Sequence, residues 1–168
     1  MILKNGAHIH LIAACGTGMG SLAIMLQQRG FRITGSDSNV YAPMSTYLRD
    51  IGIKLIEGDF LDENTKKKIS EYFATSIDII LSDMASNTTG NKGLDCIRTN
   101  QLCLDVLDFS YDKLSKNGVV VSKFFMGEEF NEIKIKAKKN FKKIDFFKPQ
   151  SSRGESRESY IHCCGLST

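Results

Sequence analysis

Three charged residues, Asp83, Lys123 and Glu158, each stand at one end of a different apolar segment. The segments are IDIILSD, GVVVSK and ESYIHCC. An apolar run that meets a charged residue is typical of a buried strand opening into a cleft, and in parallel α/β sheets ligands bind at the carboxyl ends of the strands. An acid–lysine–acid set at such an edge can hold and move a proton, so these three residues are the predicted catalytic group.

Each of these residues also has a structural explanation when it is taken singly. Asp83 could cap a helix, Lys123 could extend its amine from an apolar stem toward water, and Glu158 could form a surface ion pair. The residue types alone leave both interpretations open.

A second candidate site is the glycine-rich turn Gly16-Thr17-Gly18-Met19-Gly20, which lies between an apolar run and a helical pattern. Glycine lets the backbone approach a ligand, and a helix start offers free N–H groups to negative charge. Asp37 ends the next predicted strand, where a carboxylate can accept hydrogen bonds from ribose hydroxyls. The turn predicts a nucleotide-type ligand without distinguishing NAD, S-adenosylmethionine (SAM) or a UDP-sugar, and a tight structural turn is the alternative.

Strand-like and helical patterns alternate along the whole chain. Strands are predicted at 8–14, 31–36, 53–56, 77–82, 119–123, 141–147 and 158–163, and helices at 21–29, 43–50, 62–73, 95–114 and 128–139. This alternation predicts one α/β domain over residues 1–168, a doubly wound, mostly parallel Rossmann-like sheet of about seven strands with helices on both faces. Only a loop joins the last two strands, so the last strand is predicted to be antiparallel.

Composition narrows the class of protein. The chain has 168 residues, of which 42% are hydrophobic, enough for one core. Its net charge of +3 only weakly indicates a polyanionic partner. No apolar stretch approaches the roughly 20 residues that span a bilayer. The cysteines show neither CxxC nor metal-ligand spacing, which predicts reduced thiols, a cytoplasmic location and no metal site; they are Cys15, Cys96, Cys103, Cys163 and Cys164.

The two parts of the chain differ in composition. Residues 1–57 contain two lysines and one phenylalanine, whereas residues 58–168 contain fourteen lysines and nine phenylalanines. A surface-charge gradient within one natural protein explains this as well as a junction of two ancestral segments near residues 55–60.

The first 57 residues resemble the amino-terminal domain of Mur ligases, in particular murein tripeptide ligases, in HIHLIAACGTGMGSLA, ITGSDSNVYAPMS and LRDIGIKLIEG. In that family the segment helps to bind a UDP-sugar. Ligation also needs a P-loop, and no GxxxxGK[ST] occurs in this sequence. Ligase activity is therefore not expected, and a nucleotide-binding module for a UDP-sugar or NAD is one alternative function.

Residues 58–168 resemble FtsJ-type 23S ribosomal RNA 2′-O-ribose methyltransferases, in GDFLDE, DIILSDMASNTTGNKGLD, GVVVSKFFMGEEF and KPQSSRGESRESYI. The resemblance implies a SAM-dependent methyltransferase with strand order 3-2-1-4-5-7-6. It implies a Lys–Asp–Lys–Glu tetrad whose last three members match Asp83, Lys123 and Glu158, and an adenine contact at Asp59. The predicted cofactor-binding residues are then Gly16, Gly18, Gly20, Asp37, Asp59 and Asp83.

The sequence departs from that family in two ways. The first lysine of the tetrad lies upstream of the glycine turn in the family, and Lys4 is not in a matching motif. The glycine turn has the form found in Mur ligases. These departures predict an engineered chimera in which SAM binding is better preserved than methylation. The second alternative function is none at all, in a recombined scaffold without activity.

Ribosomal RNA is the predicted partner. Its phosphates would be contacted by Arg153, Arg157 and the lysines at positions 134, 136, 138, 139, 142 and 143. A solvated helix face is the alternative for the lysines.

Overall fold

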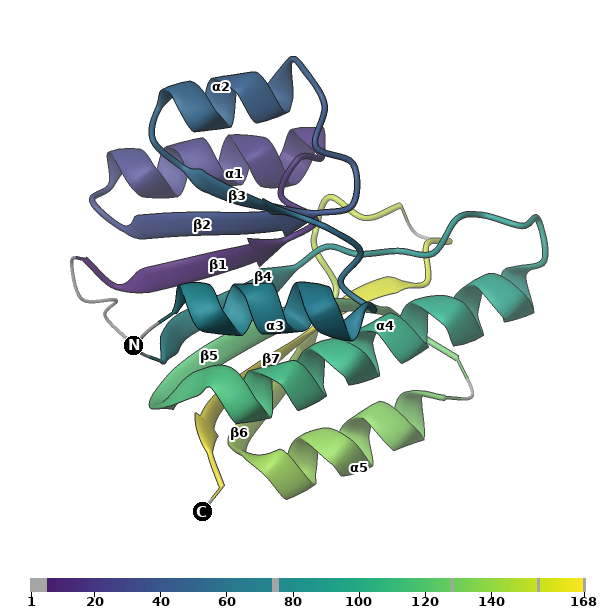
Figure 1. Ribbon diagram of the computed structural model, residues 1–168. Helices are drawn as coiled ribbons and strands as arrows, with labels where there is room; N and C mark the ends of the chain where they lie inside the picture. The colour runs from purple at the N-terminus through teal and green to yellow at the C-terminus, as the bar shows by residue number, and fades with distance from the viewer. Residues whose placement is uncertain (1–5, 74–75, 128, 154, 168) are drawn as a thin grey trace. The chain divides into compact units, whose positions relative to one another are not determined.

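The computed structural model describes residues 6–73, 76–127, 129–153 and 155–167 (Figure 1). Strands and helices alternate along these residues, as predicted. The chain divides into two compact units, Met1–Leu81 and Ser82–Thr168. This division falls more than twenty residues beyond the predicted junction of the two ancestral segments.

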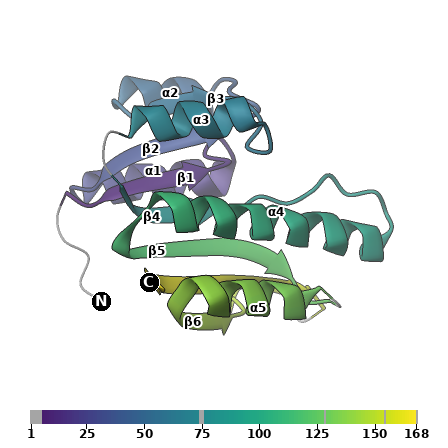
Figure 2. The same cartoon turned by 60° about the horizontal axis from the view of Figure 1, so that its bottom comes forward.

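The first unit is built on parallel strands. Strands β1 (His8–Ile12), β2 (Arg32–Asp37) and β3 (Lys54–Glu57) pair in parallel in the order β1-β2-β3, and β4 (Ile77–Ser82) closes the unit. Figure 2 shows α3 on the near side of these strands and α1 on the far side. The helices are α1 (Thr17–Gln28), α2 (Met44–Asp50) and α3 (Glu63–Tyr72).

Strand β1 is buried along its whole length, because helices cover both faces of a parallel sheet. Helix α1 begins at Thr17, four residues before the predicted start, so Gly18 and Gly20 lie inside the helix. A Cβ at Gly20 would lie 2.4 Å from the Sδ atom of Met44. Glycine at this position therefore lets α1 approach α2, which is a packing reason independent of any ligand.

The second unit is an antiparallel sheet covered by two helices. Strand β7 (Glu158–Leu166) pairs antiparallel with both β5 (Leu114–Phe125) and β6 (Phe141–Phe147). Helices α4 (Lys92–Lys113) and α5 (Phe130–Asn140) pack on each other, α4 also on β5 and α5 on β6. Alternate residues of β7, including Ile161 and Cys163, are fully buried, which leaves the intervening side chains on the other face.

The hydrogen-bonded strand order is β3-β2-β1-β4-β5-β7-β6. The predicted fold class, a doubly wound and mostly parallel sheet with the last strand antiparallel, is therefore confirmed. Some boundaries differ. Helix α4 begins at Lys92, three residues early, because the Asn91 side chain accepts hydrogen bonds from the N–H groups of Gly93 and Leu94. Glu128, the predicted first residue of α5, lies outside the described residues.

No helix in the described part of the chain has the length and apolar character that crossing a bilayer requires.

Candidate active site

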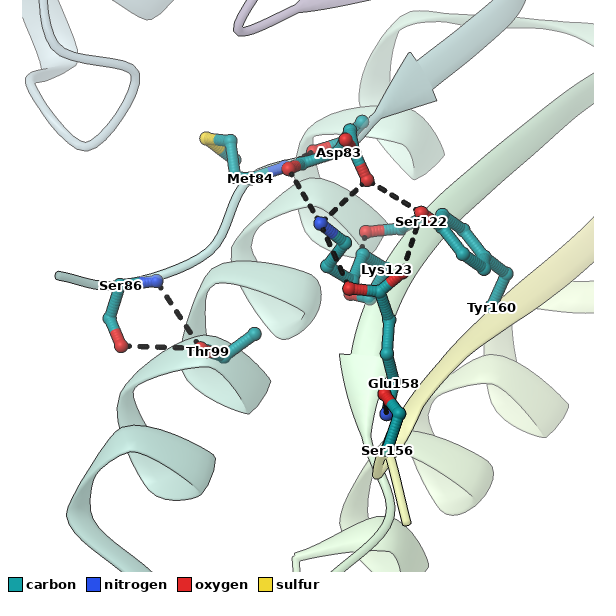
Figure 3. Close-up of polar contacts among 10 residues, drawn as sticks. Asp83, Met84, Ser86, Thr99, Ser122, Lys123, Ser156, Glu158 and Tyr160 are labelled. Carbon is teal, nitrogen blue, oxygen red and sulfur yellow. Dashed lines mark hydrogen bonds and ion pairs between the residues drawn. The ribbon is translucent and has the colours of Figure 1, made fainter. Parts of the chain in front are cut away.

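The amine of Lys123 is surrounded by oxygen atoms (Figure 3). Its Nζ lies 2.7 Å from Asp83 Oδ1, 3.3 Å from the Asp83 backbone oxygen and 3.4 Å from Glu158 Oε2. Three acceptors match the three donors of an ammonium group. The Lys123 side chain is only 10% exposed, whereas those of Asp83 and Glu158 are 36% and 34% exposed. A nearly buried cation is thus held between two carboxylates that reach solvent.

Strand register explains why these side chains meet. In the antiparallel β5–β7 pair, Lys123 lies opposite Tyr160 and Phe125 lies opposite Glu158. Paired residues of adjacent strands point to the same face, and so do residues two apart on one strand. Asp83 follows the last residue of β4. The structure therefore brings together all three residues that the sequence predicted as catalytic.

Tyr160 is a fourth member of this cluster and was not among the predicted catalytic residues. Its hydroxyl donates a hydrogen bond to Asp83 Oδ1 at 2.6 Å and lies 3.3 Å from Glu158 Oε1. Burial raises the pKa of the Tyr160 phenol, and the hydrogen bond and charge of Asp83, followed by Glu158, raise it further. The phenol therefore stays protonated. The sequence signal that could have predicted Tyr160 is the alternation of strand residues, which places Glu158 and Tyr160 on one face of β7.

The segment after Asp83 is tied to helix α4. The Ser86 backbone N–H donates to Thr99 Oγ1 at 3.2 Å, and the hydroxyls of Ser86 and Thr99 are also 3.2 Å apart (Figure 3). The Ser86 hydroxyl donates to the Asp95 carbonyl at 3.3 Å. Thr99 is fully buried. These bonds fix the segment that carries Asp83 to the helix.

The next residue of α4, Asn100, holds the end of strand β5. Its Oδ1 accepts from the Phe125 N–H at 2.8 Å, and its Nδ2 donates to the Phe125 carbonyl at 3.0 Å. The Asn100 amide thus bonds to both backbone groups of Phe125, as a neighbouring strand would. Phe125 lies two residues after Lys123. Asn100 is fully buried, so neither bond competes with bulk water. Sequence reasoning missed Thr99 and Asn100 because both lie within an amphipathic helix, where polar residues are usually exposed.

In the first unit, the glycine turn and two acidic residues lie at the carboxyl ends of β1, β2 and β3. Gly16 is the N-cap of α1, no side chain caps that end, and its first turn holds no acidic residue. Asp37 accepts from the Cys15 N–H at 2.7 Å and the Asn39 N–H at 2.8 Å. The Gly58 N–H donates to the Asp37 carbonyl at 3.0 Å. The exposed Asp59, the next residue, is therefore held near Asp37.

These groups have the chemistry that binds a nucleoside. Each carboxylate oxygen of Asp37 has a second lone pair for a ribose hydroxyl. A Cβ at Gly18 would meet nothing within 4 Å, so the backbone there borders open space. The side chain of Asp59 accepts from the Leu61 N–H at 2.9 Å, which fixes its orientation. Within the described ranges, no group of three or more His, Cys, Asp or Glu side chains is placed to hold a metal ion.

The predicted basic face is divided between two elements. Lys134, Lys138 and Lys139 are exposed on α5, while Lys136 forms an ion pair with Asp108 at 2.5 Å. The remaining two lysines, at 142 and 143, alternate along β6 and point to opposite faces. Arg153 and Arg157 are exposed in the β6–β7 connection.

Comparison with known proteins agrees with the strand order. The model of the FtsJ-like methyltransferase family matches residues 2–166. Ribosomal RNA large subunit methyltransferase E of Pelagibacter ubique is 48% identical over 108 residues, which are 64% of this chain and 53% of that protein. A crystal structure from Plasmodium falciparum, described as a ribosomal RNA methyltransferase, superposes with a TM-score of 0.78 at 26% identity, covering 98% of this chain and 89% of that one.

A further structure, human methyltransferase-like protein 13 in complex with SAH, has a TM-score of 0.65 at 12% identity and covers 94% of this chain and 71% of that one. At that identity the likeness concerns the fold, which is the fold of α/β methyltransferases. The chain belongs to the FtsJ-like methyltransferase family. It spans about half the length of the curated relatives that it matches.

The family match does not support the prediction that the chain is a chimera. It includes residues 2–57, the segment predicted to derive from a Mur ligase, together with the rest of the chain. The match thus assigns both segments to one family and gives the Mur ligase origin no support.

Proposed function

We propose that this chain binds SAM and methylates the 2′-hydroxyl of a ribose in large-subunit ribosomal RNA. The observation that carries the proposal is the placement of Lys123 between Asp83 and Glu158 in a chain of the FtsJ-like family. The relatives' names supply the class of substrate. An RNA substrate of this kind would place the protein in the cytoplasm, as its cysteine usage predicts.

The proposed nucleoside-binding residues belong to the first unit. The uncapped start of α1 and the Asp37 carboxylate would hold the nucleoside of SAM, with Gly16 and Gly18 allowing close approach and Asp59 beside the base. Asp83, which belongs to the second unit, remains a proposed cofactor contact from the family resemblance. Gly20 is explained by its approach to Met44. When bound, SAM supplies an electrophilic methyl group.

The cluster of the second unit would act on the acceptor hydroxyl. Transfer turns the 2′-hydroxyl into a methyl ether and releases its proton. Lys123, whose three donors already have oxygen acceptors, would exchange one of them for the hydroxyl oxygen and stabilise the negative charge that develops on it. The released proton would pass to the Asp83 carboxylate, which is in hydrogen-bond reach of the amine. Tyr160 keeps that carboxylate in place.

The proposed RNA contacts are electrostatic. The exposed lysines of α5 and the exposed Arg153 and Arg157 would neutralise phosphates, which makes binding strongly dependent on salt. Lys136 would contribute less, because Asp108 already pairs with it.

Titration calorimetry with SAM, NAD and a UDP-sugar tests the cofactor, and analysis of the modified RNA tests the reaction. We expect binding heat with SAM and none with NAD or a UDP-sugar. We also expect one linkage of the RNA to become resistant to alkaline hydrolysis, because a 2′-O-methyl group blocks strand cleavage at that position. Methylation of a base, with no alkali-resistant linkage, would contradict the proposal.

The alternative function is a nucleotide-binding module that retains affinity for a UDP-sugar or NAD. The uncapped start of α1 beside Asp37 favours it, because this arrangement suits any nucleotide. Heat with a UDP-sugar or NAD in the same titration would support this alternative. If none of the three ligands gives binding heat, the result would support the other alternative, a recombined scaffold without activity.

A further inference from the structure

Phe147, on strand β6, presents a large aromatic surface to solvent beside the catalytic cluster. Its ring is stacked on the ring of Tyr160, with centroids 5.7 Å apart and planes 17° apart. The residue is nevertheless 46% exposed. An exposed ring with one face already stacked has its other face available for a planar partner.

The strand register places this ring in line with Lys123. Phe147 lies opposite Tyr160 in the β6–β7 pair, and Tyr160 lies opposite Lys123 in the β5–β7 pair. The three side chains thus form one row across three strands, about two strand spacings or roughly 10 Å in length. The hydrogen bond from Tyr160 to Asp83 fixes the middle of the row.

Beyond Phe147 the row ends. Strand β6 is the last strand in the sheet order, so no strand of the described part of the chain lies on its outer side. The face of the Phe147 ring that points away from Tyr160 therefore looks off the edge of the sheet.

Phe147 is also not needed to anchor its strand. Its neighbour Phe146 points to the opposite face and packs edge-on against Phe124 at 5.8 Å and Phe130 at 4.9 Å. That contact joins β6 to β5 and α5. Phe147 thus lies on the face of β6 opposite to this aromatic contact.

Positive charge accompanies the ring. Arg153 and Arg157 are exposed on the connection between β6 and β7, which leads from Phe147 back to Glu158. The Met126 N–H donates to the Arg157 carbonyl at 2.8 Å, which fastens this connection to the end of β5. Aromatic rings combined with cations are the groups by which proteins bind unstacked nucleotides, the ring taking the base and the cations the phosphates.

We propose that Phe147 stacks a base of single-stranded RNA next to the acceptor ribose, with Arg153 and Arg157 at the adjoining phosphates. The length of the row assigns this base to a nucleotide neighbouring the acceptor, because the acceptor ribose itself must lie at Lys123. The identity of the ligand as RNA rests on the proposed function. The subsite selects unpaired RNA and tolerates any base, since every base has a π-face.

Two probes separate stacking from charge: a fluorescein-labelled oligoadenylate and a ribose-phosphate strand of the same length without bases. Their dissociation constants are measured by fluorescence anisotropy for the wild type, Phe147→Leu and Phe147→Trp. We expect the wild type to bind oligoadenylate about tenfold more tightly than the abasic strand, as one stacked base provides. Phe147→Leu should abolish this ratio and Phe147→Trp should retain it. Ile135→Ala, at an exposed apolar residue of α5, should leave it unchanged.

Equal affinity of the wild type for both strands, or an unchanged ratio in Phe147→Leu, would overturn the inference. Methyl transfer to ribosomal RNA is measured on the same preparations. A wild type that methylates RNA without the expected ratio refutes the stacking site alone. A wild type that shows the ratio and transfers no methyl group refutes the proposed function and leaves the stacking site in place.

Discussion

At the scale of residues, the cluster is a nearly buried ammonium saturated by three oxygen atoms, and two of those oxygens belong to Asp83. Asp83 therefore has the central place: it accepts from Lys123 at 2.7 Å and from Tyr160 at 2.6 Å. Removing it would leave a buried cation with fewer acceptors and would free the phenol. The chemistry of the site depends on this one carboxylate more than on Glu158, whose distance to the amine is 3.4 Å.

The phenol of Tyr160 reports on this arrangement. Burial and the adjacent carboxylates raise its pKa, so it should remain protonated at about pH 10, where a free tyrosine is half ionised. The difference between the ultraviolet pH titrations of the wild type and Tyr160→Phe isolates this residue. Asp83→Asn should lower the Tyr160 pKa toward its usual value, because it removes a negative charge from beside the phenol. A Tyr160 midpoint at about pH 10, the value of a free tyrosine, would contradict the geometry of the cluster.

At the scale of elements, helix α4 is the support of the site. Two consecutive buried residues, Thr99 and Asn100, bond to the segment after Asp83 and to the end of the strand that carries Lys123. One helix thus sets the separation of two catalytic side chains that are 40 positions apart in the chain.

Asn100→Leu tests this support. The substitution leaves the N–H and the carbonyl of Phe125 without their partner, and each unsatisfied group costs about 1–3 kcal/mol. We expect a lower free energy of unfolding in urea, and in the folded protein a lower kcat with an unchanged KM for SAM. Asn131→Leu, on the exposed surface of α5, should change stability by no more than about 0.5 kcal/mol. An Asn100→Leu protein with the kcat of the wild type would show that α4 does not position Lys123.

The same elements show what sequence could and could not predict. Asp83, Lys123 and Glu158 were predictable because each marks the point where an apolar strand meets the edge of the sheet. Tyr160 could have been predicted as well, because side chains two residues apart on a strand share a face and Tyr160 is two residues after Glu158. The partners of Thr99 and Asn100 were not, because those bonds join residues 13 and 25 positions apart and depend on how the helix is rotated. The start of α1 was placed too late because Gly18 and Gly20, poor helix formers, lie inside it.

At the scale of the whole molecule, the chain forms two compact units, and the sequence predicts that they belong to one domain. We propose that the units unfold together. Urea unfolding followed by far-ultraviolet circular dichroism and by a fluorescent probe attached in each unit should then give coincident transitions. Separate midpoints for the two probes would show two independent domains.

Acid should destabilise the molecule through His10. Burial, and then the charge of His8, lower the His10 pKa to about 3, and its ring bonds to Thr34 and Ser36. The unfolded chain binds a proton below about pH 6.5 and the folded one does not, so this stability is complete above that pH and is lost as the pH falls toward 3. The urea midpoint should therefore drop between about pH 7.5 and about pH 5. His10→Gln, which keeps polar atoms at this site, should show a smaller drop; an equal drop would refute the assignment.

The central claim is that Lys123 acts on the acceptor hydroxyl of an RNA ribose. Transfer of a tritiated methyl group from SAM to unmethylated large-subunit ribosomal RNA, compared between the wild type and Lys123→Met, tests it most directly. We expect transfer by the wild type, a loss of about 10²- to 10⁴-fold in Lys123→Met, and SAM dissociation constants that agree within about threefold. Equal rates for the two proteins, or no transfer by a wild type that binds both SAM and RNA, would contradict the claim.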